Sequence, residues 1–401
     1  MRALFLFFVF IFWLPFKLFA VDFKWTYEDG YRDRLLYIHP FINYNFNSSW
    51  YNRWEVNYFS GHGFLFNVGS VTTHDLLVDG SLVINQALGK GFRFRGEARW
   101  LETLHLKNKQ KSVFIGLEKQ VFDYSSIYLI VNPAYDKEFT DLNMGLLFAD
   151  SSYQNYLRLG LLWEDFVYDE KNGLDGISDK IPLSLQWYGR YHWKQFVFYT
   201  DGRLSKGFER RFPNQELSPD LTAHDLLWND LRAKFYYLPS DQSIFCLSAY
   251  HYYFKEVKRF TAQENNYDYL NKIYNIAFDY LQTFKELNRI RVQIQYVIQK
   301  AQSTGYRGHR YDRHDFMSAI SYERFISAHT LELQYMYALP QWEYVGLSAN
   351  PENYNEGGMM DKVKFGWTYN FPQGAKFYIS ISHEVRSGNF GGANLFYMVL
   401  F

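Results

Sequence analysis

Cysteine is almost absent from this sequence. Cys246 is the single cysteine among 401 residues, so the chain cannot form an intramolecular disulfide. Cys246 lies in the apolar segment 244–247, where we expect it to act as a small buried hydrophobic residue. An excess of charge of one sign is also absent, because 42 Lys and Arg balance 42 Asp and Glu. The overall charge therefore gives no indication of nucleic-acid binding.

Long hydrophobic runs are absent after Phe19. A membrane-spanning helix needs about 20 consecutive apolar residues, so we expect no transmembrane helix in the remainder of the chain. Residues 1–20 combine a positive start, a short apolar core and a candidate cleavage site after Ala20. This pattern predicts a cleaved signal peptide. The mature chain would then begin with Val21 rather than with a lipid-modified cysteine.

Aromatic residues, in contrast, are abundant. The chain contains 35 Tyr, 38 Phe and 11 Trp, which amount to 21% of its residues and exceed what one soluble core requires. Tyr and Trp concentrate at the two interfaces of a membrane, where one end of the side chain is apolar and the other is wet. The mean hydropathy of −0.33 fits a membrane β-barrel, because lipid-facing and water-facing residues alternate and their average is polar.

One pattern recurs from end to end: about ten residues of alternating apolar and polar character, followed by a polar connection. A soluble β-sandwich also alternates. Here, however, the polar faces carry Arg, Glu, Gln and Asn at nearly every site, and the apolar faces end in aromatic residues, as the girdles of a membrane barrel do. The expected strands include 36–44, 92–100, 113–117, 142–148, 157–163, 231–237, 290–298, 331–337, 363–371, 377–381 and 395–401.

The C-terminus carries the most specific motif. Leu395, Tyr397, Val399 and Phe401 fall on one face of an extended segment, because strand side chains alternate between faces. This ending resembles the sorting strand of bacterial outer-membrane β-barrel proteins of the porin type, in which a terminal Phe follows hydrophobic residues at every second position. The alternative is a buried last strand of a soluble β domain. The resemblance implies the outer membrane of a Gram-negative bacterium, contact with outer-membrane lipid and lipopolysaccharide, and recognition of these four residues by the barrel assembly machinery.

The predicted fold class is all-β: a single antiparallel transmembrane β-barrel of about 18 strands, within a range of 16 to 20. The barrel occupies residues 21–401, and 21–33 is a candidate periplasmic N-terminal segment. With the C-terminus in the periplasm, short turns fall at one end of the barrel and long loops at the other, which is the outer-membrane arrangement. The expected turns include 150–152, 238–241, 286–288 and 372–374, and the expected loops are 169–180, 206–227, 259–271, 301–315 and 349–361.

The inward side of each strand follows from its lipid-facing side, since a shift by one residue inverts every side chain. Basic residues outnumber acidic ones on this inward side, which predicts a lumen that attracts anionic solutes. The alternative is that most of these charges pair across neighbouring strands. The predicted channel-lining residues are Arg53, Arg93, Arg95, Glu97, Arg99, Glu118, Arg158, Arg190, Arg203, Arg232, Lys234, Arg289, Arg291, Glu332, Lys362, Lys364, Lys376 and Arg386. The same side contains Glu55, Glu164, Asp201, Asp230 and Glu384.

A barrel of this size is too wide for side chains alone to fill, so we expect an aqueous channel or an inserted plug. The longest connection, 205–228, contains the acidic and basic run Glu209, Arg210 and Arg211. These residues are candidates for a constriction loop that folds into the lumen. The alternative is an ordinary surface loop.

Residues suited to chemistry are few. Ser382 and His383 only loosely echo the pattern of outer-membrane phospholipases, and as strand neighbours they point to opposite faces, whereas an activated hydroxyl must reach its base. The segment 308–315 contains His and Asp side chains that suit a divalent ion, but its interleaved arginines favour a solvated loop. We therefore predict no enzymatic activity, no metal and no cofactor.

The predicted function is a porin-like outer-membrane channel for passive diffusion of small hydrophilic solutes, anionic ones among them, in a monomer or a homotrimer. The resemblance supplies this function by analogy, because function resides in sites rather than in folds. One alternative is a barrel that acts as a scaffold or secretion conduit for a partner protein or polymer. Another is a barrel lipid hydrolase or protease.

Overall fold

The computed structural model describes residues 62–70, 76–103, 108–132, 141–150, 155–163, 177–178, 183–211, 221–305, 308–346, 353–372 and 374–400. Within these ranges nearly every residue lies in an antiparallel strand of one sheet, and the 3-10 helix η3 (Gln263–Asn265) is the only helix. No helix in these ranges has the length and apolar character needed to cross a membrane.

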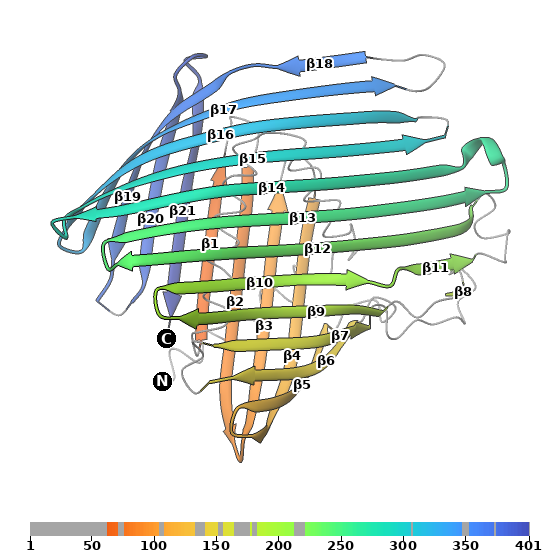
Figure 1. The fold of residues 1–401 in the computed structure, drawn as a ribbon, viewed down its shortest axis with the longest axis horizontal. Helices are drawn as coiled ribbons and strands as arrows, with labels where there is room; N and C mark the ends of the chain where they lie inside the picture. Colours follow the sequence, from red (N-terminus) through yellow and green to blue (C-terminus); the bar gives the residue numbers. More distant parts are fainter. Residues whose placement is uncertain are drawn as a thin grey trace, which may run out of the picture.

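The strands follow one another around the wall in chain order (Figure 1). The first ten are β1 (His62–Ser70), β2 (Leu76–Gly89), β3 (Phe92–Thr103), β4 (Asn108–Phe122), β5 (Ser125–Asn132), β6 (Asp141–Ala149), β7 (Tyr156–Trp163), β8 (Ile177–Ser178), β9 (Leu183–Trp193) and β10 (Phe196–Ser205). They are followed by β11 (Phe208–Arg211), β12 (Leu221–Ser240), β13 (Ser243–Phe260), β14 (Tyr267–Phe284), β15 (Asn288–Thr304), β16 (His309–Ile326), β17 (His329–Gly346), β18 (Asn353–Gly357), β19 (Met360–Asn370), β20 (Lys376–Glu384) and β21 (Phe390–Leu400).

The sheet closes on itself. β1 pairs with β2 on one side and with β21 on the other, over Gly63–Gly69 and Asn394–Leu400. Of the 21 strands in the described ranges, the short β8, β11 and β18 prolong their neighbours at one end of the barrel, which leaves eighteen in the closed circuit. The predicted single antiparallel barrel of about 18 strands is therefore confirmed. Closure leaves no open edge in the circuit of eighteen described strands, as a lipid environment requires, whereas the short β8 and β18 outside it each pair on one side only.

The two faces of the wall differ as the alternation predicted. Large apolar side chains are exposed on the outer face, among them Ile115, Leu161, Ile276, Leu333 and Ile381. The residues between them on each strand point into the barrel and are mostly polar. Leu395, Tyr397 and Val399 of the terminal strand share the outer face with Val68, Phe66 and Phe64 of β1, which lie opposite them in register.

Tight turns join the strands at the end of the barrel where β21 finishes. Lys90, Lys194 and Ser327 adopt positive φ angles of 51°, 54° and 54° in three of these turns, as do Lys285 and Glu286 in a fourth. Two-residue hairpins favour this left-handed backbone because it matches the twist of the flanking strands. The predicted turns at 238–241 and 286–288 belong to this end, and the strands before 150–152 and 372–374 finish there as well, so this end is the periplasmic one.

The wall is uneven in height. β12 to β17 contain 17 to 20 residues each, whereas β5, β6 and β7 contain 8 or 9. In Figure 1 the long strands lie in front of β1 to β4, which form part of the opposite wall. The long strands include much of what the sequence predicted as extracellular loop, because β15 and β16 leave only 305–308 between them. Above the membrane the outer face also meets water and carries polar residues such as Lys300, Arg310 and Asp312, so the apolar alternation that identifies strands is lost there.

Two predicted loops are corrected in the same way. Glu209, Arg210 and Arg211 lie in β11, which pairs with β12 and β8, so they prolong the wall instead of folding into the lumen as a constriction. The segment 309–315 lies in β16 rather than in a solvated loop. The signal peptide, residues 21–33, the strand at 36–44, Arg53, Glu55, Glu164 and Phe401 lie outside the described residues.

An outward substitution tests this assignment of faces. Ile294→Arg places a charge on the outer face of β15, near the middle of its apolar run, and should lower the free energy of unfolding by about 2–4 kcal/mol. Gln302→Arg, on the same face near the extracellular end, should cost at most about 1 kcal/mol. Urea unfolding in lipid vesicles measures both values. Equal costs at the two positions would contradict the assigned membrane span.

Candidate functional site: the inner wall of the barrel

The structure places most of the predicted lining residues on the inner face. Arg93, Arg95, Glu97, Glu118, Arg158, Arg190, Arg203, Arg232, Lys234, Arg289, Arg291, Glu332, Lys362 and Lys364 occupy the alternation opposite the exposed apolar side chains. Lys376 is exposed at the periplasmic start of β20. Arg386 lies in the turn after β20, where its Nε atom is 3.6 Å from an Asp361 carboxylate oxygen, and so it is part of the rim rather than of the inner wall. The side chain of Arg99 is outside the described part.

Several inward carboxylates were missed by the sequence analysis. Asp279 lies between the outward Phe278 and Tyr280, so the alternation could have placed it inward. Glu256 and Asp315 lie at levels where polar residues occur on both faces, and there the alternation gives no clear side. The missed acidic residues are Asp141, Glu256, Asp279, Asp315 and Glu323, and the missed basic residues are Lys258 and Arg313. The inner wall is consequently less basic than predicted, and cross-strand pairing of opposite charges is common on it.

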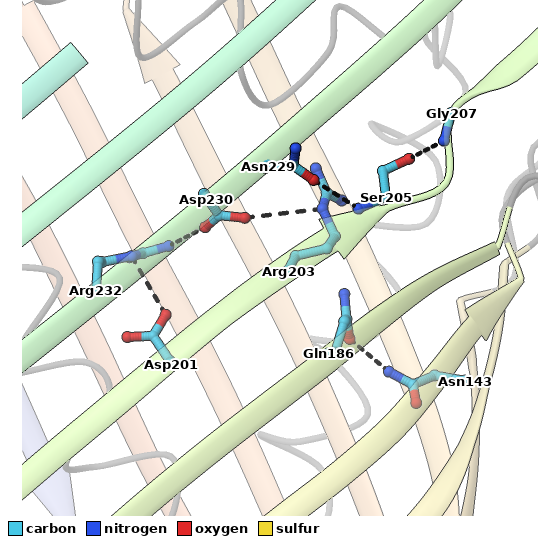
Figure 2. Close-up of polar contacts among 9 residues, drawn as sticks. All are labelled: Asn143, Gln186, Asp201, Arg203, Ser205, Gly207, Asn229, Asp230 and Arg232. Carbon is cyan, nitrogen blue, oxygen red and sulfur yellow. Dashed lines mark hydrogen bonds and ion pairs between the residues drawn. The ribbon is translucent and has the colours of Figure 1, made fainter. Parts of the chain in front are cut away.

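The clearest cross-strand pairing is a charge ladder on β10 and β12 (Figure 2). Asp201 lies opposite Arg232 in register, and Arg203 lies opposite Asp230. The Arg232 side chain approaches carboxylate oxygens of both Asp201 and Asp230 at 3.2 Å, and Arg203 approaches Asp230 at 3.9 Å. The side chains are only 10–13% exposed, so pairing compensates charges that have lost most of their hydration.

Aromatic rings lie against the arginines of the ladder and against Arg158. The Arg203 guanidinium lies 5.0 Å from the ring centroid of Trp228, and that of Arg232 lies 5.6 Å from Tyr250. Arg158 lies 4.2 Å from the ring of Tyr128. A cation over an aromatic face is attracted by the ring quadrupole, and the ring limits the rotamers that the arginine can adopt. The inner wall from β5 to β13 is thus a fixed array of cations, carboxylates and rings.

The ladder continues toward β5 through uncharged groups. Asn143 donates a hydrogen bond to the Gln186 carbonyl at 2.6 Å, and its own carbonyl accepts one from the Tyr128 hydroxyl at 3.2 Å. Tyr128 fits because Gly145 and Gly160 lie opposite each other in register beneath it. A Cβ atom added to Gly160 would collide with the Tyr128 hydroxyl. The two glycines therefore provide the space that this inward ring occupies.

Solvent reaches the inner wall more freely toward the periplasmic end. Arg291 pairs with Asp279, its Nε donating at 2.8 Å, and the two side chains are 36% and 25% exposed. Arg289 pairs with Glu323 at 3.3 Å and Lys364 with Glu332 at 3.2 Å, again with solvent access. These inward charges are both paired and hydrated, which is the environment of a wet lumen wall.

Farther toward the extracellular end, the inner face of β12 to β16 is buried. Arg313 and Asp315 form an ion pair of 2.6 Å in which both side chains are only 1% exposed. Beside them lies an apolar cluster of Leu226, Trp228, Tyr252, Phe254, Ile273 and Val297. The inner wall is therefore less exposed to solvent at this level than toward the periplasmic end. Period-two alternation does not predict this cluster, because it marks inward positions by their polar side chains.

A cluster of polar side chains, formed by His224, Glu256 and Lys258, lies near the extracellular rim of the barrel. The Glu256 carboxylate lies 2.8 Å from His224 Nε2 and 2.9 Å from Lys258 Nζ. Burial alone would raise the pKa of Glu256, but the hydrogen bonds from His224 and Lys258 outweigh it and lower that pKa below its ordinary value. Burial, with the nearby Glu256 charge, raises the pKa of Tyr267 to about 12.

The residues considered for catalysis and metal binding do not form a shared site. Ser382 donates its hydroxyl hydrogen to the Gly392 carbonyl at 3.1 Å. His309 faces inward beside Ser303, whereas His314 faces outward and bonds Tyr296. Among the described residues no three His, Cys, Asp or Glu side chains are grouped closely enough to hold a metal ion.

Comparisons with protein-family models and with curated proteins return no match. Among solved structures, OmpT, an outer membrane protein of Vibrio cholerae, is 8% identical with a TM-score of 0.40, covering 85% of this chain and 96% of its own. Acinetobacter baumannii OccAB3 is 10% identical with a TM-score of 0.41 and coverages of 85% and 98%. Pseudomonas aeruginosa OccK10 is 7% identical with a TM-score of 0.39 and coverages of 85% and 97%.

The identities and TM-scores are low, and the class of this chain follows from its own architecture. Closure of the sheet, the outward apolar band and the tight turns at one end are the architecture of Gram-negative outer-membrane barrels of the porin type. The chain is a protein of the outer membrane.

The charge ladder makes a stability prediction. Arg232→Met removes the cation that Asp201 and Asp230 share, and should lower the free energy of unfolding by about 3 kcal/mol. Adding Asp201→Asn should restore part of that loss, because the carboxylate that has lost its cation is then removed, whereas Asp230 keeps its contact with Arg203. Urea unfolding in vesicles measures both, with exposed Lys206→Met as the control. A double variant no more stable than Arg232→Met would show that Arg232 and Asp201 do not stabilise the protein through each other.

The cluster of His224, Glu256 and Lys258 should make the stability of the protein depend on pH. Because the pKa of Glu256 is lowered on folding, its stabilisation is present above the unfolded value of 4.5 and disappears as pH falls through the folded value. Glu256→Gln should therefore lose about 1 kcal/mol relative to wild type near pH 7 and much less near pH 3. Exposed Glu264→Gln in η3 is the matched control. A pH-independent difference between wild type and Glu256→Gln would refute this coupling.

Proposed function

We propose that this protein is an outer-membrane channel through which small hydrophilic solutes diffuse passively. The observation that carries the proposal is the wet, charged inner face of a closed barrel, seen in the Arg291–Asp279 and Lys364–Glu332 pairs. A barrel of eighteen strands is wider than its side chains can fill. Charges that line it need water or mutual pairing, and these pairs have both. Such a wall suits polar solutes and repels apolar ones.

Solute preference would be determined at the level where the inner wall carries fixed charges and is least exposed to solvent. The ladder of Asp201, Arg203, Asp230 and Arg232 lies beside the buried cluster on β12 to β16, so a solute that passes this level would meet fixed charges of both signs. Arg158 and Arg190 stand on the same inner wall over the rings of Tyr128 and Tyr199. We infer a modest preference for anions, weaker than the sequence alone suggested, because the newly placed carboxylates offset part of the basic charge.

We also propose how the protein is exported and inserted into the outer membrane. A signal peptide over residues 1–20 would direct export, and the barrel assembly machinery would recognise Leu395, Tyr397, Val399 and Phe401. The role of the described residues in closure supports this, because β21 forms the seam with β1. A homotrimer, stabilised by part of the outward apolar surface, is the proposed assembly.

Conductance in planar lipid bilayers tests the channel. The purified protein should produce stable ion-conducting steps, and the reversal potential in a KCl gradient should indicate chloride over potassium. Arg158→Gln with Arg190→Gln should shift the reversal potential toward potassium, because two inward cations are lost. The control is Arg310→Gln, an outward cation near the extracellular end, which should leave selectivity unchanged. Folded protein without conductance would overturn the channel and favour a scaffold or conduit for a partner.

A further inference from the structure

Three lysines gather on the outer face of β13, β14 and β15, where the apolar band ends. Lys300 follows the outward residues Ile294, Tyr296 and Ile298 along β15. Lys272 takes the equivalent place on β14, on the extracellular side of the outward Tyr274 and Ile276. Lys255 takes it on β13. Aromatic residues followed by cations mark the level at which the hydrocarbon of the bilayer gives way to headgroups.

The register brings these lysines close together. Lys272 lies directly opposite Lys300 on the neighbouring strand, a relation in which Cβ atoms are about 4.5–5.5 Å apart. Lys255 is one diagonal step away, because Tyr253 is the residue opposite Lys272, and diagonal neighbours are about 7–8 Å apart. Like charges directly opposite each other destabilise a strand pair. An anion between them would remove that cost.

The nearby carboxylates are engaged elsewhere. Asp312 lies directly opposite Lys300 on β16, but its carboxylate, like that of Glu343, lies 3.5 Å from the Arg310 guanidinium. Asp268 lies 2.6 Å from Arg259. Within the described ranges, Lys255, Lys272 and Lys300 have no carboxylate within ion-pairing distance. The Lys272 ammonium lies 5.7 Å from the ring of Tyr253, which holds it on the outer face rather than in the lumen.

We propose that Lys255, Lys272 and Lys300 form a binding site for the phosphate groups of lipopolysaccharide in the outer leaflet. The site is at the extracellular boundary of the apolar band, and it concentrates positive charge against the lipid rather than against the lumen. A phosphate offers several strong acceptors to ammonium donors, and basic clusters at a membrane surface attract anionic lipid headgroups. The rings of Tyr274 and Tyr296 below the lysines would contact the start of the acyl chains.

A charge-matched pair of variants tests the site. In Lys272→Gln with Lys300→Gln, the two opposed cations are lost. In the control, Lys206→Gln with Arg324→Gln, the same charge is removed from an exposed extracellular position and from the periplasmic end of the outer face. Native mass spectrometry of the folded proteins in neutral detergent measures binding of lipopolysaccharide, dephosphorylated lipopolysaccharide, phosphatidylglycerol and inorganic phosphate.

Wild type and the control should bind lipopolysaccharide alike, and the lysine variant should bind it at least about tenfold more weakly. Dephosphorylation of the lipid should weaken binding to wild type to a similar extent. Equal affinity of the two variants, or equal binding of dephosphorylated lipid, would overturn the proposal. So would phosphatidylglycerol or inorganic phosphate binding as tightly as lipopolysaccharide. If the lysine variant does not fold, the comparison of the lipids on wild type decides.

Discussion

Pairing of β1 with β21 is the constraint on which the rest of this structure depends. In the hydrocarbon of a membrane an unpaired N–H or C=O group has no water to bond, so an open sheet edge cannot persist there. The seam between Gly63–Gly69 and Asn394–Leu400 removes the last edge. Once the sheet is closed, each strand has one face toward lipid and one toward the lumen, and alternation along the chain determines which residue takes which face.

The inner wall follows from that separation. Charged side chains that would be costly in lipid are collected in a confined space, where they either pair or contact water. At β10 and β12 they do so as a ladder in which Arg232 bridges Asp201 and Asp230. Nearer the periplasm, Arg291 and Asp279 are paired but partly hydrated. Toward the extracellular end, the inner face carries the buried apolar cluster around Tyr252 and Ile273, so the exposure of the inner wall to solvent changes along its length.

The outer wall has its own gradient. Apolar residues such as Ile276 and Ile294 cover the middle of the long strands, and Lys272 and Lys300 begin where those residues end. The same strand therefore presents hydrocarbon-compatible side chains at one level and headgroup-compatible ones a single alternation step higher. This change is possible because β12 to β17 continue well beyond the membrane as a paired sheet, where the outer face is polar.

Much of this architecture could be read from the sequence, because in a membrane barrel local alternation reports the environment of each residue directly. The barrel class, the approximate strand number, the short turns and the inward side of residues such as Arg158, Arg203 and Lys362 follow from period-two patterns and the terminal motif. Those patterns disappear where a strand leaves the membrane, so the strand at 309–315 and the pairing of Glu209 to Arg211 in β11 could not be seen. Only the tertiary structure decided that β1 meets β21, that Arg313 and Asp315 are buried together, and that Lys272 lies opposite Lys300. These relations depend on strand register across long stretches of sequence, and no local pattern encodes the register.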